Sequence, residues 1–105
     1  MHFFYTPLDR DSRLQLLQRH DANALFRLID TNRAHLRRWL TWERQTQSAH
    51  DCEQFIASRL QITAENGGFT AAIWHKDQLA GLIELQKISW VDRRSAIGYW
   101  LGEAF

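Results

Sequence analysis

The segment from Ala96 to Leu101 is apolar on both of its faces when it is read as a β-strand, because it contains Ile97, Tyr99 and Trp100. Such a strand needs a covering layer on each side of the sheet and a hydrogen-bonding neighbour on its free edge. The sequence given ends at Phe105, and the preceding segments supply cover for one side at most. We therefore expect residues 1–105 to form one incomplete α/β domain, interrupted part of the way through its fold.

The composition is that of a small globular domain. The 105 residues carry a formal net charge of +1, and 45% of them are hydrophobic. A nearly neutral chain is not expected to bind nucleic acid or membrane surfaces broadly, and no stretch approaches the roughly 20 apolar residues that span a bilayer. A single cysteine, Cys52, excludes an internal disulfide and is typical of a reducing compartment. We therefore expect a cytoplasmic protein.

Helical periodicity dominates the chain up to residue 65. A short strand is expected near Leu14–Leu17, and Asp21 then predicts the N-cap of a helix. Apolar residues at helical spacing predict one long helix or two consecutive helices that run to about Leu40.

A further helix is predicted after a polar connection. Ser48 and Asp51 have the spacing of a capping box, and the residues of the expected buried stripe are Cys52, Phe55, Ile56 and Leu60. The sequence Asn66-Gly67-Gly68 is expected to end this helix, with a glycine in the left-handed conformation.

From residue 69 onward the pattern becomes extended. Residues 69–75 and 79–88 predict two strands joined as a hairpin through 76–78, and residues 95–101 predict a third antiparallel strand. Gly81, inside the second strand, indicates a bulge or a close backbone approach. The expected order is a strand, two to three helices, and a three-stranded antiparallel meander.

Three segments in this order resemble the first half of the GNAT N-acetyltransferases. They are Asp30–Trp42 (DTNRAHLRRWLTW), Leu79–Ile83 (LAGLI) and Ile97–Leu101 (IGYWL). The likeness is closest to the branch that acetylates the N-terminal serine or alanine of ribosomal proteins, and it covers nearly the whole chain from about Arg13. It implies a transferase that moves an acetyl group from acetyl-CoA, as co-substrate and without a metal, to an amine. That amine would belong to a ribosomal or other protein N-terminus, or to a small acceptor.

The same resemblance implies the cofactor-binding residues. In the family, the strand that corresponds to residues 97–101 offers backbone groups to the pantetheine arm and the thioester. The implied positions are Tyr99, Trp100 and Leu101, with Gly102 allowing the strand to diverge from its neighbour. The alternative is an ordinary core strand whose aromatic residues only pack. The family's glycine-rich loop, which holds the pyrophosphate at a helix N-terminus, would follow Phe105.

Acetyl transfer also needs a group that removes a proton from the attacking amine. An α-amine has a pKa near about 8, so a modest base or a water relay is sufficient. Glu103 is the first candidate and Glu84 the second. The alternatives are a solvated residue near a terminus for Glu103 and an outward carboxylate on a half-exposed sheet for Glu84.

The resemblance places Arg33, Trp39 and Trp42 near the groove for the acceptor substrate. With neighbouring arginines they could instead form an aromatic, basic nucleic-acid patch. The commoner arrangement of such a segment is an amphipathic helix with a solvated charged face.

A second function class stays open at the level of sequence. A non-catalytic remnant or interaction module could keep the helices and hairpin without the enzymatic activity, and the absence of the phosphate-binding loop favours it. The IGYWL strand favours the enzyme. In either case the apolar edge of the last strand predicts self-association, or the binding of a complementing fragment.

Overall fold

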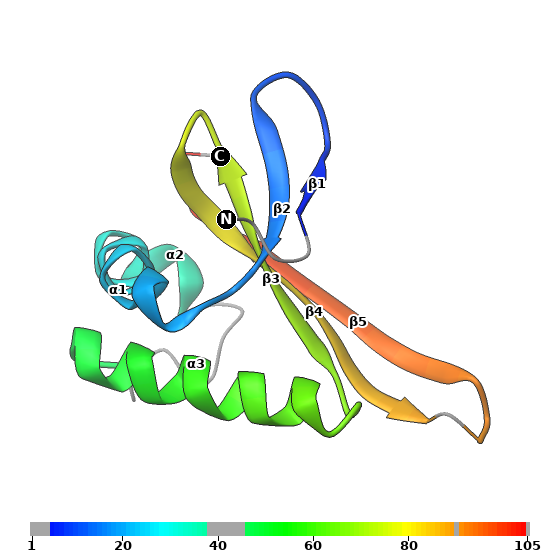
Figure 1. The fold of residues 1–105 in the computed structure, drawn as a ribbon. Helices are drawn as coiled ribbons and strands as arrows, with labels where there is room; N and C mark the ends of the chain where they lie inside the picture. The colour runs from blue at the N-terminus through cyan, green and yellow to red at the C-terminus, as the bar shows by residue number, and fades with distance from the viewer. Residues whose placement is uncertain (1–4, 38–45, 90, 105) are drawn as a thin grey trace.

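The computed structural model describes residues 5–37, 46–89 and 91–104. These residues form an antiparallel sheet with helices gathered on one side of it (Figure 1). The strand order follows the chain, β1-β2-β3-β4-β5, and every neighbouring pair is antiparallel. The elements are β1 (Thr6–Pro7), β2 (Ser12–Leu16), η1 (Arg19–Asp21), α1 (Ala22–Thr31), α2 (Arg33–Leu36), α3 (Ala49–Ala64), β3 (Phe69–His75), β4 (Gln78–Ser89) and β5 (Arg94–Leu101). The predicted α/β class and element order are confirmed.

β1 is an element that the sequence did not predict. Its two residues pair with Leu14 and Arg13 of β2, and Asp9 shapes the connecting turn by accepting hydrogen bonds from the backbone N–H groups of Asp11 and Ser12. A two-residue strand has no periodicity to detect, and Pro7 is tolerated because this strand lies at the edge of the sheet.

The chain enters α1 through a tighter turn than expected. The carboxylate of Asp21 accepts a hydrogen bond from the backbone N–H of Gln18 at 2.9 Å, which closes the 3-10 turn η1. Asp21 itself has helical dihedral angles and makes no side-chain cap to α1. Asp21 is the N-cap residue of α1, as predicted, although its carboxylate makes no cap to α1 because it is engaged one turn earlier. The alternative of two consecutive helices is confirmed as α1 and α2, whereas Leu40 lies outside the described residues.

The predicted capping box of α3 is confirmed for the Ser48 side chain, whereas Asp51 accepts from the residue before the N-cap and not from the N-cap itself. Ser48 Oγ accepts a hydrogen bond from the N–H of Asp51 at 3.1 Å, and the Asp51 carboxylate accepts one from the N–H of Gln47 at 2.9 Å. Cys52 and Ile56 of the predicted stripe are fully buried.

The end of α3 differs from the prediction in one respect. Asn66 is the left-handed residue, with φ of 60°, and no glycine of the described ranges has a positive φ. Asparagine can adopt this conformation because its short polar side chain bonds locally. A Cβ at Gly67 would lie 3.3 Å from Ile62 Cγ2, a tight contact that a small shift of the Ile62 side chain would have to relieve.

The β3–β4 hairpin turns through Lys76 and Asp77, whose φ angles are 49° and 61°. Two central residues with positive φ are the geometry of a type I′ turn. Both features considered for Gly81 from the sequence, a close backbone approach and a bulge, are present in the structure. A Cβ at this position would lie 2.0 Å from the carbonyl oxygen of Trp100, and the β3–β4 register shifts opposite it, between Ile73 and Trp74.

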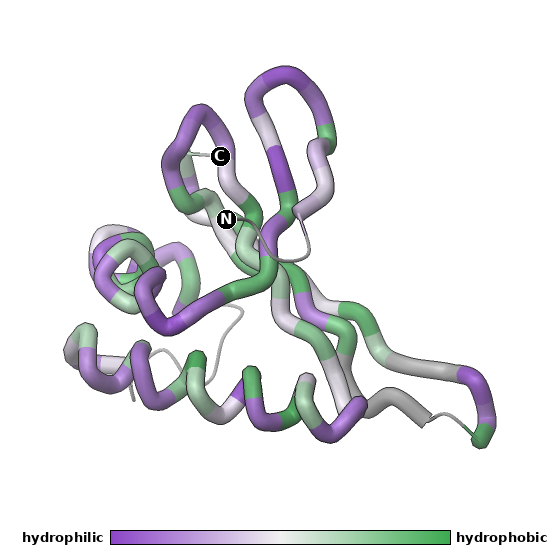
Figure 2. Tube along the Cα trace, in the orientation of Figure 1, coloured by the Kyte–Doolittle hydropathy of each residue, from purple (hydrophilic) through white to green (hydrophobic). Residues whose placement is uncertain are grey.

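The core lies between the helices and one face of the sheet. Cross-strand neighbours Ala72, Leu82 and Trp100 point to the helices and pack with Leu25 and Ile29. The tips of the β1–β2 and β3–β4 hairpins are hydrophilic, whereas the strand centres carry many of the hydrophobic residues (Figure 2). The turn between β4 and β5 differs, because Val91 in it is hydrophobic and exposed.

The opposite face of the sheet carries apolar side chains that no described helix covers. Ile97 and Tyr99 of β5 are 69% and 71% exposed there. Within the described ranges, no helix has both the length and the apolar character needed to cross a membrane.

Candidate active site

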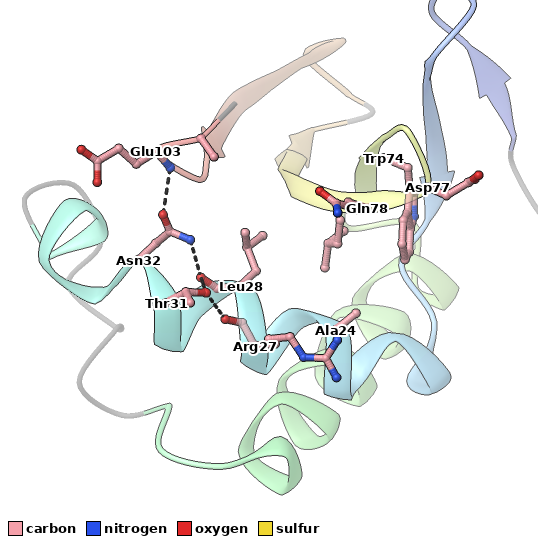
Figure 3. A pocket seen from close by; sticks show the side chains of 11 residues that line it. Ala24, Arg27, Leu28, Thr31, Asn32, Trp74, Asp77, Gln78 and Glu103 are labelled. Carbon is pink, nitrogen blue, oxygen red and sulfur yellow. Dashed lines mark hydrogen bonds between the residues drawn. The ribbon is translucent and has the colours of Figure 1, made fainter.

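A pocket of about 730 Å³ lies between α1, the β3–β4 turn and the residues that follow β5 (Figure 3). A volume of this size is typical of small-molecule and peptide-end sites. α1 contributes one wall and the hairpin the other, and the lining residues that carry the argument are Arg27, Leu28, Asn32, Trp74, Leu79 and Glu103.

Asn32 connects the two elements that meet at one end of the pocket. It follows the last residue of α1, and its Nδ2 donates a hydrogen bond to the carbonyl oxygen of Leu28 at 2.8 Å. Its Oδ1 accepts a hydrogen bond from the backbone N–H of Glu103 at 2.9 Å. The amide therefore fixes where the chain leaves β5. Asn32 lies within the family-like segment 30–42, but no role was predicted for it from the sequence. The signal that could have indicated a role is a polar residue at a junction between two helices.

Glu103 lines the pocket, and its side chain is exposed. It lies at one end of the pocket, while Trp74 and Asp77 lie at the other (Figure 3). Its carboxylate is directed away from the other lining side chains, so the backbone of Glu103 borders the pocket while its charge faces outward.

The structure does not bring Glu84 to this pocket. Glu84 lies on the helix-facing side of β4, where its Oε1 is 3.7 Å from Nε of Arg59 on α3 and its side chain is 15% exposed. The ion pair with half-buried Arg59 explains how the Glu84 carboxylate is stabilised in this position. The outward, solvated orientation that the sequence suggested for Glu84 is not observed.

The far wall of the pocket is tied to β2. The guanidinium of Arg13 lies over the Trp74 ring, 5.1 Å from its centroid, and Arg13 Nη1 donates to Asp77 Oδ1 at 3.0 Å. Both contacts fix side chains of the β3–β4 hairpin, because a stacked guanidinium can also form an ion pair at its edge.

β5 is the last strand of the described sheet, so one of its edges is free in this part of the chain. The N–H of Gly102 donates to the carbonyl of Ala80 at 2.8 Å, and alternate residues of an antiparallel strand direct their backbone groups to opposite edges. The backbone groups of Trp100 therefore face β4, and those of Tyr99 and Leu101 face the free edge. The indole of Trp100 is buried in the core.

Of the predicted acceptor residues, the structure describes Arg33, which does not line the pocket. Arg33 braces α1 and the segment before α3, since its Nε lies 2.9 Å from Asp30 Oδ1 and its Nη2 donates to the Thr46 carbonyl at 2.6 Å. It is not among the described residues that line the pocket. Trp39 and Trp42 lie outside the described residues.

Cys52 is a buried thiol at the start of α3 and is remote from the pocket lining. Burial raises its pKa to about 11, and the nearby carboxylate of Asp51 acts in the same direction. A thiol with a raised pKa is a poor nucleophile at neutral pH, which agrees with the structural role predicted for it. Over the described residues, no three or more His, Cys, Asp or Glu side chains come together in a way that could hold a metal ion.

The antiparallel sheet with helices gathered on one side defines an α/β fold, and comparison with known families identifies it. The acetyltransferase (GNAT) domain family matches residues 12–105, and the chain belongs to this family.

Known proteins agree with this assignment. The chain is 31% identical over 103 residues to the Bacillus subtilis (strain 168) protein named "Putative ribosomal N-acetyltransferase YdaF", covering 97% of the chain and 56% of that protein. Among solved structures, the RimL ribosomal L7/L12 alpha-N-protein acetyltransferase in complex with coenzyme A superposes with a TM-score of 0.91 at 22% identity, over 96% of this chain and 57% of that one.

The microcin C7 self-immunity acetyltransferase MccE, in complex with acetyl-CoA and AMP, superposes with a TM-score of 0.88 at 23% identity, over 92% of this chain and 54% of that one. At these identities the two structures show the shared fold. The chain spans about half the length of the curated relatives that it matches.

Proposed function

We propose that this chain takes part in N-acetyl transfer from acetyl-CoA to the amine of a protein N-terminus, ribosomal or other, in the cytoplasm. The observation that carries the proposal is that β5 has a free edge and that the residues which follow it, Glu103 and Ala104, line the pocket. Membership of the GNAT family supports the reaction class, and the names of its relatives support a protein acceptor.

The free edge of β5 fits the chemistry of acetyl-CoA. The pantetheine arm carries amide groups that can pair with an exposed strand edge in the way that another strand would. The backbone groups of Tyr99 and Leu101 are directed to that edge, and Trp100 anchors the strand from the core. Acetyl-CoA supplies an activated acyl group as its thioester. In this proposal, Tyr99, Trp100, Leu101 and Gly102 hold and position it.

Glu103 acts on the acceptor amine. Only the neutral amine attacks a carbonyl carbon, so its proton must pass to a base during or before attack. Glu103 lies at one end of the pocket that we assign to the acceptor, and the hydrogen bond from its N–H to Asn32 fixes its backbone. Its exposed side chain is directed outward in Figure 3 and would have to turn toward the pocket to reach a bound amine. In this scheme Glu103 accepts the proton directly or through a water, and Asn32 positions it.

A transfer assay with a matched pair of variants tests this role. The chain is incubated with acetyl-CoA and a peptide that has a free N-terminus, and acetylated peptide is measured by mass spectrometry. Glu103→Gln is expected to lower the rate by about 10²- to 10⁴-fold, the usual contribution of a general base. Glu53→Gln removes an exposed carboxylate of α3 that does not line the pocket, and should leave the rate unchanged.

Calorimetric titration with acetyl-CoA separates the binding function from the catalytic one. Glu103→Gln should bind acetyl-CoA as the parent chain does, because Glu103 is assigned to the acceptor. Absence of acetyl-CoA binding and of transfer would overturn the enzymatic proposal. The outcome would then favour an interaction module that uses the exposed apolar residues Ile97 and Tyr99 of β5.

A further inference from the structure

The walls of the pocket between α1 and the β3–β4 hairpin are largely apolar. Leu28 lines it from α1 and Leu79 lines it from β4, and both belong to the buried core. Ala24 of α1 and Trp74 of β3 extend this lining, and both pack against the same core. In Figure 3 the side chains of Leu28 and Trp74 project into the space between α1 and the hairpin. Apolar walls that core packing holds in place favour an apolar group of a ligand.

Most polar side chains of the lining are already bound to other parts of the chain. The hydroxyl of Thr31 donates to main-chain carbonyl groups of α1. The amide of Asn32 joins the ends of α1 and β5, and Asp77 forms an ion pair with Arg13. These groups would have to give up existing partners before they could bind a polar ligand.

The two other charged side chains of the lining do not cross the space between the walls. The carboxylate of Glu103 is directed outward, and the exposed side chain of Arg27 extends along α1 toward Ala24 instead of toward the hairpin (Figure 3). Gln78 is exposed and uncharged. An apolar group that enters between Leu28 and the hairpin therefore displaces water without burying an unpaired charge.

We propose that the pocket selects an acceptor peptide that carries a large apolar side chain, such as that of phenylalanine or leucine, close to its free N-terminus. The volume of about 730 Å³ is far more than the side chain of an N-terminal serine or alanine would fill. The pocket also extends from Trp74 to Glu103 (Figure 3), which suits a peptide better than a small amine. This inference rests on the proposed acetyl transfer, since that function assigns the pocket to the acceptor.

Peptide binding to the chain tests the inference without any need for catalysis. Hexapeptides with free N-termini are titrated by calorimetry: AAAAAA, three peptides with phenylalanine at the first, second or third residue, and three with asparagine at the same residues. At one position or more, the phenylalanine peptide should bind about tenfold more tightly than both AAAAAA and its asparagine counterpart, because an aromatic side chain leaves water. Benzylamine is titrated in parallel as a small apolar amine.

Two variants fill the pocket, and a third is their matched control. Ala24→Leu adds a large side chain to the lining from α1, and Ala104→Leu adds one from the exposed end of the lining beyond β5. Each should reduce the preference for phenylalanine to less than about threefold. Ala34→Leu makes the same change on an exposed residue of α2 that does not line the pocket, and it should keep the preference. Circular dichroism and urea unfolding show whether each variant is folded.

The outcomes separate this inference from the proposed reaction. Equal binding of the phenylalanine and asparagine peptides, a preference that survives both filling variants, or an equal loss in Ala34→Leu would overturn the inference. Benzylamine binding as tightly as the best peptide would also overturn it, in favour of a small acceptor. Acetylation of AAAAAA, measured by mass spectrometry, would leave acetyl transfer intact in each case. Failure of every peptide to bind would overturn the inference together with the acceptor pocket, whereas acetyl-CoA binding is measured separately.

Discussion

Asn32 and Glu103, 71 positions apart in the chain, are joined by a hydrogen bond of 2.9 Å from the Glu103 N–H to the Asn32 side-chain oxygen. The nitrogen of the same amide donates to the carbonyl of Leu28 at 2.8 Å. One side chain thus holds the end of β5 against the end of α1. The candidate base has a fixed backbone position because of this contact.

Replacing Asn32 should loosen the end of β5. Asn32→Ala removes both hydrogen bonds and is expected to lower the free energy of unfolding by about 1–2 kcal/mol. It should also increase hydrogen exchange at the Glu103 amide, which NMR can measure directly. Asn23→Ala, an exposed position of α1, is the control and should change neither quantity appreciably. Unchanged exchange at Glu103 in Asn32→Ala would contradict the role given to this amide.

The two glycines Gly81 and Gly98, on adjacent strands, should respond oppositely to alanine. A Cβ at Gly81 would lie 2.0 Å from the Trp100 carbonyl oxygen, whereas a Cβ at Gly98 meets nothing within 4 Å. Gly81→Ala is expected to destabilise the fold by about 1–3 kcal/mol or more through overpacking. Gly98→Ala should be neutral or slightly stabilising, since alanine loses less chain entropy on folding. Urea unfolding of both variants measures the difference, and similar midpoints would argue against the close β4–β5 approach.

A glycine in place of Lys76 should stabilise the turn between β3 and β4. Lys76 has φ of 49°, a conformation that costs a residue with a side chain roughly 1–2 kcal/mol. Lys76→Gly is therefore expected to raise the free energy of unfolding by up to about 1 kcal/mol, after allowance for the greater flexibility of glycine in the unfolded chain. Thermal and urea unfolding report this change. A loss of stability would mean that the turn does not require positive φ at this residue.

Cys52 should make stability depend on pH in the alkaline range. Its pKa is raised by burial from 9.0 to about 11 in the folded state. The folded chain therefore retains the thiol proton after the unfolded chain has lost it. The corresponding stability is complete below pH 9 and is lost as the pH rises toward 11, by roughly 1.4 kcal/mol per pH unit. Unfolding of the parent and of Cys52→Ala at pH 8, 9 and 10 isolates the effect, and the difference between them should narrow with rising pH. A constant difference would mean that the thiol pKa is not raised.

The elements that the sequence predicted well are those with local signals. Ser48 and Asp51 mark the start of α3 through hydrogen bonds between near neighbours, and the change from helical to alternating period marks β3. Gly81 indicated a close backbone approach, because a glycine inside an apolar strand weakens the strand and is expected there only where a side chain would not fit. Each of these signals depends on a few consecutive residues.

What could not be predicted depends on contacts between distant segments. No local pattern shows that Asn32 bonds to Glu103, or that Arg13 stacks on Trp74, because these pairs are brought together by the sheet register and by packing of α1. Asp21 occupies the predicted N-cap position of α1, but the choice its side chain makes between two possible backbone partners could not be predicted, and it closes the earlier turn. Glu84 and Glu103 are both glutamates in the sequence, and only their neighbours in the fold distinguish the half-buried ion pair of Glu84 from the exposed Glu103 at the pocket.

The stacking of Arg13 on Trp74 has a consequence for how this fold can diversify. Arg13 belongs to β2 and does not line the pocket, yet it braces both Trp74 and Asp77, which do. The shape of that wall therefore depends on a residue of β2 that does not itself line the pocket. A substitution at Arg13 can therefore change which molecules fit the pocket even when every residue that lines the pocket stays the same.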